Sequence, residues 1–157
     1  MKCICARLAV LSLAMLALSA ASVIAEEKAP AFKLETIRGR AVFLGEALER
    51  KFAVKTVPEA RQRTIAIETT DGQLVPVVED VRGRAFRADE RLRKPEIEVL
   101  VRRYEGSPAV QVIRLFELVA DGKYELDYWC EICAITMFEL KECECCQGDI
   151  ELRRTKK

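Results

Sequence analysis

The 157-residue sequence contains no histidine. Without this residue the chain cannot build a Ser-His-Asp or Cys-His nucleophile, a CxxCH haem attachment site, an HExxH zinc protease site or a zinc deaminase site of the H-x-E type. Any metal ion that the chain binds must therefore be held by thiolate or carboxylate groups.

The sequence also lacks an excess of either sign of charge. It has 26 Lys and Arg against 25 Asp and Glu, a formal net charge of +1, which gives no argument for binding nucleic acid or an anionic membrane through net charge. Half of the residues are apolar and 32% are charged. This composition predicts a folded domain of ordinary size with an appendage, rather than a disordered chain.

The first 25 residues have the pattern of an export signal. Lys2 and Arg7 form a basic start, residues 8–25 carry no charge, and Val-Ile-Ala precedes Glu26 as a cleavage site would. The alternative is an uncleaved membrane anchor, because 18 uncharged residues are just long enough to span a bilayer. We therefore expect a signal peptide at residues 1–25 and a protein of the periplasm or cell envelope.

Strand and turn signals alternate through the middle of the chain after a short polar lead at residues 26–35. Gly39 is expected to mark a bulge or bend in the first strand, residues 45–61 an irregular or helical connection, and residues 88–93 a short helix. Strands are expected at residues 36–44, 64–69, 74–78, 97–104 and 109–119. This pattern predicts a mainly β domain at residues 36–121.

The order of these elements, with a helical link between the third and fourth of five main strands, resembles the OB fold. The resemblance covers residues 36–119 and depends on strand order and turn positions, not on a diagnostic motif. It implies a five-stranded, partly open Greek-key barrel. A six-stranded small barrel and a plain antiparallel sheet are alternatives that the pattern leaves open.

Cysteine is absent from residue 6 to residue 129, and five cysteines then fall within the 17 positions 130–146. Two CxxC pairs, Cys130 with Cys133 and Cys143 with Cys146, are separated by nine residues, and Cys145 lies inside the second pair. Each pair can place two sulfurs on one side of a tight turn, and two facing turns can supply four thiolates to a tetrahedral metal ion.

This spacing resembles a short zinc ribbon within residues 122–157, a segment that ends in a basic tail. The resemblance implies a structural zinc ion bound by Cys130, Cys133, Cys143 and Cys146, with Cys145 as a possible substitute ligand. Gly148 is expected where the second turn needs an unhindered backbone. Tyr128 and Trp129 are expected to cover one side of the site, and the residues after the last pair to form a closing strand.

Three alternatives to structural zinc remain at this point: disulfides, rubredoxin-like redox iron, and a reactive dithiol. An odd number of cysteines cannot all pair within one chain, and the two pairs lack the proline and the adjacent glycine that are usual in rubredoxin. The neighbouring carboxylates Glu131, Glu142 and Glu144 are expected to disfavour thiolates in the absence of metal, which argues against a reactive dithiol.

Eight basic residues lie between positions 82 and 103, and within an OB-like fold they could line a groove for a polyanion. A solvated, ion-paired surface is the alternative. The candidate binding residues are Arg82, Arg84, Arg87, Arg102 and Arg103.

The whole arrangement of signal, small barrel and ribbon resembles a group of exported bacterial proteins, a resemblance that implies no activity. We therefore expect a non-catalytic, zinc-stabilised binding or assembly module of the periplasm or cell envelope, whose partner is an envelope protein or a polyanionic ligand. Membrane contact is expected only through an uncleaved signal segment. The alternative functions are rubredoxin-like electron transfer or thiol redox chemistry, and polyanion binding by an OB domain.

Overall fold

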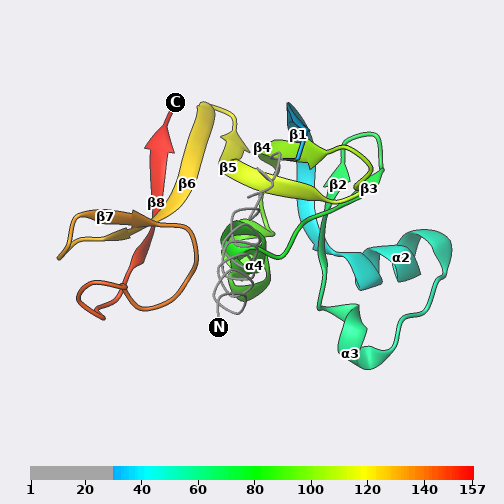
Figure 1. The fold of residues 1–157 in the computed structure, drawn as a ribbon, viewed down its shortest axis with the longest axis horizontal. Coiled ribbons are helices and arrows are strands. Elements are labelled where there is room, and N and C mark those ends of the chain that lie inside the picture. The colour runs from blue at the N-terminus through cyan, green and yellow to red at the C-terminus, as the bar shows by residue number, and fades with distance from the viewer. Residues whose placement is uncertain (1–29) are drawn as a thin grey trace, which may run out of the picture.

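The computed structural model describes residues 30–157, so the expected signal peptide lies outside the described residues. The mainly β fold predicted from the sequence is confirmed, with eight strands in one antiparallel sheet (Figure 1). The strands are β1 (Phe32–Phe43), β2 (Ile65–Thr69), β3 (Leu74–Pro76), β4 (Ile97–Tyr104), β5 (Val110–Val119), β6 (Gly122–Cys130), β7 (Ile135–Met137) and β8 (Glu151–Lys156). The helices are α2 (Leu44–Phe52), α3 (Pro58–Arg61), α4 (Val81–Ala88) and a 3-10 turn at Glu90–Leu92. None of these helices is long and apolar enough to cross a membrane.

The sheet is open, whereas the sequence predicted a five-stranded barrel. Its strand order is β3-β2-β1-β4-β5-β6-β7, and β8 pairs with β6 beside this path. One isolated parallel bridge, Val77 to Val110, links the end of β3 to the start of β5. There the Val78 N–H donates to the Val110 carbonyl over 2.9 Å. A single bridge does not continue the ladder, because β3 ends at Pro76, which has no N–H to donate.

Gly39 marks the point at which β1 changes partners. Residues 32–39 of β1 pair with β4, residues 39–43 pair with β2, and Gly39 belongs to both registers. A Cβ atom at this position would lie 2.0 Å from the Glu68 carbonyl oxygen. Only glycine therefore permits the close approach of β1 and β2 at the bend that the sequence predicted.

Within residues 88–93, where a short helix was expected, a 3-10 turn forms at Glu90–Leu92 and no α-helix. The main helix of this link is α4, which ends where the expected helix begins, and the 3-10 turn follows it. Asp80 caps α4, since its Oδ1 atom accepts hydrogen bonds from the N–H groups of Arg82 at 3.1 Å and Gly83 at 3.0 Å. Asp89 then accepts from the Arg91 N–H over 2.9 Å, so the second cap starts a new turn instead of continuing one helix.

Strand β6 joins the two parts of the molecule. Its first residues, 122–125, pair with β5, and its last residues, 128–130, pair with β7. Because β8 pairs with residues 124–129 and overlaps both of these registers, β8 must lie on the opposite side of β6. We refer to β1–β5 with their helices as the sheet body, and to residues 130–150 as the cysteine unit. In Figure 1 the strands β6–β8 lie on the left and α4 lies near the centre.

The core is continuous between the two parts. Fully buried side chains of the sheet body include Ile67, Val99 and Val101, and the same cluster extends through Tyr128 to Cys130. Alternation along β4, where the apolar side chains point inward, explains the burial in the sheet body. The cysteine unit therefore packs on the sheet body and does not have a separate core.

Candidate metal centre

The first CxxC pair lies in the hairpin between β6 and β7. Cys130 is the last residue of β6, is fully buried, and pairs across the hairpin with Ile135. The chain turns through residues 131–134, and Ala134, directly after Cys133, has a φ angle of 52°. This left-handed residue reverses the chain and brings it back as β7.

The second CxxC pair forms a similar turn outside any strand. The Gln147 N–H donates to the Cys143 carbonyl over 2.9 Å, and the Cys143 N–H donates to the Gly148 carbonyl over 2.9 Å. Gln147, directly after Cys146, has a φ angle of 58°. In both turns, therefore, a left-handed residue other than glycine follows the second cysteine, which has an energetic cost of about 1–3 kcal/mol at each position.

Gly148 lies where the second turn comes close to the first, in agreement with the expected unhindered backbone. The residue with the left-handed backbone is Gln147, while Gly148 provides room between the two turns. A Cβ atom on Gly148 would lie 3.3 Å from the Ile132 Cδ1 atom and 3.4 Å from the Cys146 Sγ atom. Glycine at this position thus lets the second turn approach the first.

The structure brings together the four cysteines that the spacing singled out. The Sγ atoms of Cys130, Cys133, Cys143 and Cys146 all lie within 4.8 Å of one another. The Cys130 and Cys146 sulfurs are 3.5 Å apart, well beyond the disulfide length of about 2.05 Å, and all five cysteines of the described residues are free thiols. Zn–S bonds of about 2.3 Å place the sulfurs of a tetrahedral site about 3.8 Å apart. The donor set and its dimensions therefore fit a zinc ion held by four thiolates.

Cys145 lies outside this group of four and is exposed. Its thiol nevertheless interacts with Cys133, and this contact, together with the Cys146 thiol and burial, raises the pKa of Cys133. Cys145 therefore lies next to the site, within the turn formed by the second CxxC pair. Its side chain is an exposed thiol that does not belong to the group of four.

The pKa of the Cys143 thiol is lowered, whereas the pKa values of Cys130 and Cys133 are raised. The backbone N–H groups of Cys146 and Cys145 point at the Cys143 sulfur and lower its pKa to about 7. The expectation that nearby carboxylates disfavour thiolates is therefore wrong for Cys143. Two of these carboxylates make other contacts, since Glu144 pairs with Lys141 and Glu131 accepts from the Trp129 indole N–H over 2.8 Å.

Tyr128 and Trp129 point in opposite directions, because neighbouring residues of a strand face opposite sides of the sheet. Tyr128 is buried on the same side as Cys130, and its hydroxyl donates to Asp89 Oδ2 over 2.7 Å. Burial and this carboxylate raise the pKa of Tyr128. Trp129 lies on the other side with its ring 4.1 Å from the Arg153 guanidinium carbon. Tyr128 therefore connects the cysteine unit to the sheet body.

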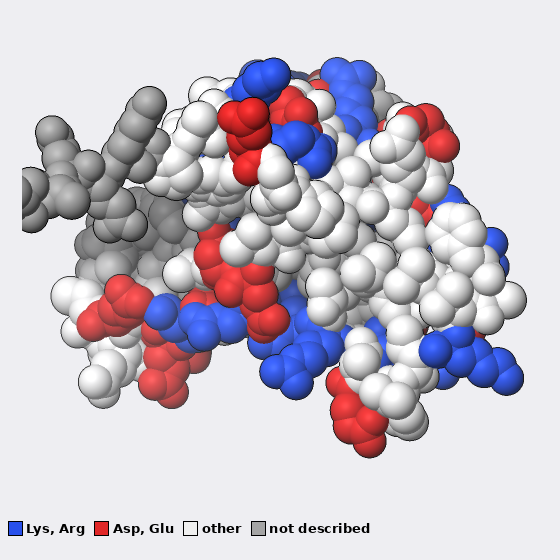
Figure 2. Space-filling model, turned by 45° about the vertical axis from the view of Figure 1, so that its right-hand side comes forward, with Lys and Arg blue, Asp and Glu red and all other residues white. Residues whose placement is uncertain are grey.

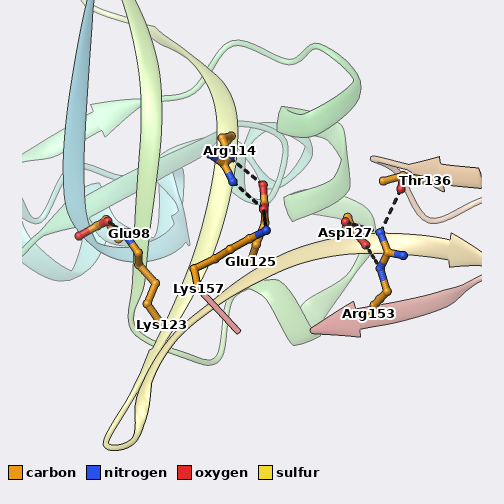
Figure 3. A network of polar contacts seen from close by, with 8 residues as sticks. All are labelled: Glu98, Arg114, Lys123, Glu125, Asp127, Thr136, Arg153 and Lys157. Carbon is orange, nitrogen blue, oxygen red and sulfur yellow. Dashed lines mark hydrogen bonds and ion pairs between the residues drawn. The ribbon is translucent and has the colours of Figure 1, made fainter. Parts of the chain in front are cut away.

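Ion pairs along β6 fix the strands that carry the cysteine unit (Figure 3). On β6, Glu125 accepts two hydrogen bonds of 2.7 Å from Arg114 of β5, and Asp127 accepts from Arg153 of β8 over 2.8 and 2.9 Å. Arg153 also donates to the Thr136 hydroxyl of β7 over 3.0 Å. Arg114 thus connects β5 to β6, and Arg153 of β8 contacts both β6 and β7. The Arg114 guanidinium lowers the pKa of Glu125 to about 2.

Helix α4 clamps the loop between the two CxxC pairs. Arg84 donates from Nη2 to the buried Glu139 carboxylate over 2.6 Å, and the Arg82 guanidinium carbon lies 3.7 Å from the centre of the Phe138 ring. Burial lowers the pKa of Arg82. Sequence reasoning missed this clamp, since Arg84 and Glu139 are 55 residues apart and no local pattern connects them.

The other candidate arginines do not line a common groove. Arg87 pairs with Glu79, and Arg103 donates to Glu35 over 2.8 Å. Arg102 lies 5.0 Å from the Phe32 ring centre, and its Nε atom is buried without a hydrogen-bond partner. On the face shown in Figure 2, basic and acidic side chains are intermingled. Each of these arginines therefore contacts a neighbouring side chain.

Comparisons with known proteins gave no match: no family model, no curated protein and no solved structure corresponds to this chain.

Proposed function

We propose that this chain is an exported, non-catalytic binding or assembly module of the periplasm or cell envelope, stabilised by a structural zinc ion. The observation that carries the proposal is the group of four cysteine sulfurs within 4.8 Å of one another. A zinc ion with four protein ligands has no open position at which to activate water, so such a site contributes to folding and not to catalysis.

The proposed architecture is an OB-like barrel followed by a terminal zinc ribbon. Support for the barrel comes from the order β3-β2-β1-β4-β5, from α4 between β3 and β4, and from the parallel bridge that connects β3 to β5. Support for the ribbon comes from the two similar cysteine turns and from β8, which returns along β6 after the second turn. Zinc binding would offset the energetic cost of the left-handed residues Ala134 and Gln147.

Export is proposed from residues 1–25, which combine a basic start, an uncharged stretch and a cleavage pattern. The partner is proposed to be an envelope protein. A polyanion has less support because Arg84, Arg87 and Arg103 are already paired with carboxylates.

Elemental analysis combined with a thiol count, on protein isolated from the cell envelope, tests this proposal. We expect one zinc ion per chain, a single reactive thiol (Cys145) before chelation, and five after chelation under reducing conditions. Red protein that contains iron in place of zinc would indicate a rubredoxin-like centre. Metal-free protein whose thiols react only after reduction would indicate disulfides.

Cell fractionation and N-terminal sequencing test the export proposal independently of the metal. The expected result is protein in the periplasmic or envelope fraction with Glu26 as its first residue. A cytosolic chain that retains residues 1–25 would contradict export, whatever the metal content.

A further inference from the structure

The first half of β1 has one unpaired edge within residues 30–157. β4 pairs with residues 32–39 of β1, but β2 covers only residues 39–43 on the other side. Backbone groups of residues 32–37 on that other side bond to nothing among the described residues, and the next contact is the Thr70 N–H donating to the Arg38 carbonyl over 3.3 Å. An unpaired edge of this kind is a template for another strand.

Strand alternation identifies the backbone groups that point away from β4. The Ala31 carbonyl accepts from Glu105, which leads out of β4, so Ala31 and every second residue after it point toward β4. The Arg38 carbonyl accepts from Thr70 on the opposite side, in agreement with this assignment. It follows that Phe32, Leu34 and Thr36 present their N–H and C=O groups on the unpaired edge.

Along this edge the exposed apolar side chains of Phe32 and Leu34 alternate with the charged Lys33 and Glu35. Phe32 is 46% exposed and Leu34 is 60% exposed. By contrast, β8 carries Arg153, Arg154 and Lys156, charges that discourage pairing with a further strand. On the free edge of β1 the two charged side chains, Lys33 and Glu35, have opposite signs and therefore do not repel an antiparallel second copy.

We infer that this edge is a dimerisation site at which the β1 strands of two copies pair antiparallel about Leu34. A two-fold axis there makes Leu34 and the partner's Leu34 a hydrogen-bonded pair, and Phe32 pairs with the partner's Thr36 in the same way. On the other face of the strand, Lys33 lies directly opposite the partner's Glu35.

The side chains match this register. Lys33 makes no ion pair among residues 30–157, so its ammonium is available to the partner's Glu35, which also accepts from Arg103 of its own chain. Leu34 covers the partner's Leu34, so that the most exposed apolar residue of β1 is shielded from water. Charge and hydrophobicity thus favour a second copy over an unrelated strand, which would need its own matching pattern.

Sedimentation equilibrium of the mature chain tests the inference, with Leu34→Pro as the main variant. The Leu34 N–H points away from β4, so proline removes an edge hydrogen bond without removing a ladder bond. We expect a monomer–dimer equilibrium for the parent chain and a dissociation constant at least about tenfold higher for Leu34→Pro. The control Val57→Lys, at a 63% exposed residue between α2 and α3, should dimerise as the parent does. A chain that stays monomeric at every concentration, or an unchanged dimer in a folded Leu34→Pro protein, would overturn the inference.

Amide hydrogen exchange gives a second readout that does not need a variant. Leu34 and Thr36 should exchange rapidly in dilute solution and slowly in concentrated solution, whereas Lys33 and Glu35 should be protected in both, because they bond to β4. Protection of Leu34 and Thr36 in a chain that sediments as a monomer would mean that the chain covers its own edge and would exclude the dimer. Leu34→Lys replaces Leu34→Pro if the proline variant does not fold, and it should weaken the dimer similarly.

Discussion

The sheet body and the cysteine unit achieve order by different means. The sheet body encloses fully buried apolar side chains such as Ile67 and Val99, held by long strand ladders. The cysteine unit exposes Ile132 by 77% and Phe138 by 40%, and residues 138–150 contain no regular strand or helix. Its buried side chains are those of Cys130, Met137, Glu139, Cys143 and Ile150. Apolar burial therefore accounts for the order of the body, whereas under the proposed function a metal ion held by the four thiols accounts for the order of the unit.

The largest expected effect concerns the apolar core of the sheet body. Phe86 of α4 is 1% exposed, and Phe86→Ala should lower the free energy of unfolding by about 3–5 kcal/mol, because it removes buried area and leaves a cavity. Urea denaturation measures the change. The matched control is Phe52→Ala at a residue that is 61% exposed, for which we expect a change of about 0.5 kcal/mol or less. Equal effects of the two substitutions would mean that burial does not stabilise the body.

A smaller effect is expected at the contact between the two regions. Tyr128→Phe removes the buried hydrogen bond to Asp89 and should lower the free energy of unfolding by about 1–3 kcal/mol. Tyr124→Phe removes a hydrogen bond of the same length, 2.7 Å, to Asp121 at an exposed site, and should cost about 0.5 kcal/mol or less. Thermal unfolding of the two variants distinguishes them, and a larger loss in Tyr124→Phe would contradict the role assigned to Tyr128.

Acid should affect the two regions in separate pH windows. The pKa of Glu125 falls from 4.5 to about 2 in the folded chain, mainly through Arg114, and Lys123 lowers the pKa of Glu98 in the same direction. Because both folded-state pKa values are depressed, this stabilisation is present at neutral pH and is lost on acidification; for Glu125 it is complete above about pH 4.5 and is lost as the pH falls through about 2. Zinc release, which requires protonation of thiolates, should come at higher pH.

The measurement for this prediction is stability as a function of pH in the parent and in Glu125→Gln. The variant should be less stable at neutral pH and should lose part of the pH dependence between about 4.5 and 2. Glu59→Gln, on the exposed helix α3, is the control and should follow the parent. Superimposable curves for parent and Glu125→Gln would show that the Arg114 pair adds no stability.

The smallest expected effect concerns the backbone of the cysteine turns. Ala134→Gly relieves a left-handed residue with a φ angle of 52° and should be neutral or stabilising by up to about 1 kcal/mol. Ala88→Gly, at the end of α4, should instead destabilise by about 0.5–1 kcal/mol. Opposite signs in thermal unfolding are the expected outcome, and a clear loss in Ala134→Gly would contradict the turn geometry.

Much of the sheet could be predicted from the sequence, because strand β4 alternates Ile97, Val99 and Val101 between turn signals, and its predicted bounds match the structure. The expected closing strand after the last cysteine pair forms as β8, although its sequence ELRRTK is almost entirely polar and shows no alternation. Helix α4 was missed because Gly83 weakens the helical pattern. Gly83 is needed there, since a Cβ atom would lie 2.0 Å from the Val78 carbonyl oxygen.

In the candidate site, too, one part could be predicted from the sequence and another part could not. CxxC spacing predicts which sulfurs meet, because it depends on local turns. The contacts that position the site are long-range, as Tyr128 with Asp89 and Arg84 with Glu139 show, and no spacing rule encodes them. The lowered pKa of Cys143 likewise depends on backbone N–H directions that only the folded turn defines.

The most direct test of the central claim is hydrogen exchange with and without a zinc chelator, followed separately in the two regions. After chelation we expect the amides of Cys143 and Gln147 to lose protection, while those of Val99 and Val101 keep it. Cys143→Ser should behave like the chelated chain, and Cys145→Ser like the zinc-bound parent. Cysteine-unit amides that stay protected in metal-free, reduced protein would contradict the claim that a metal ion held by four thiolates orders this segment.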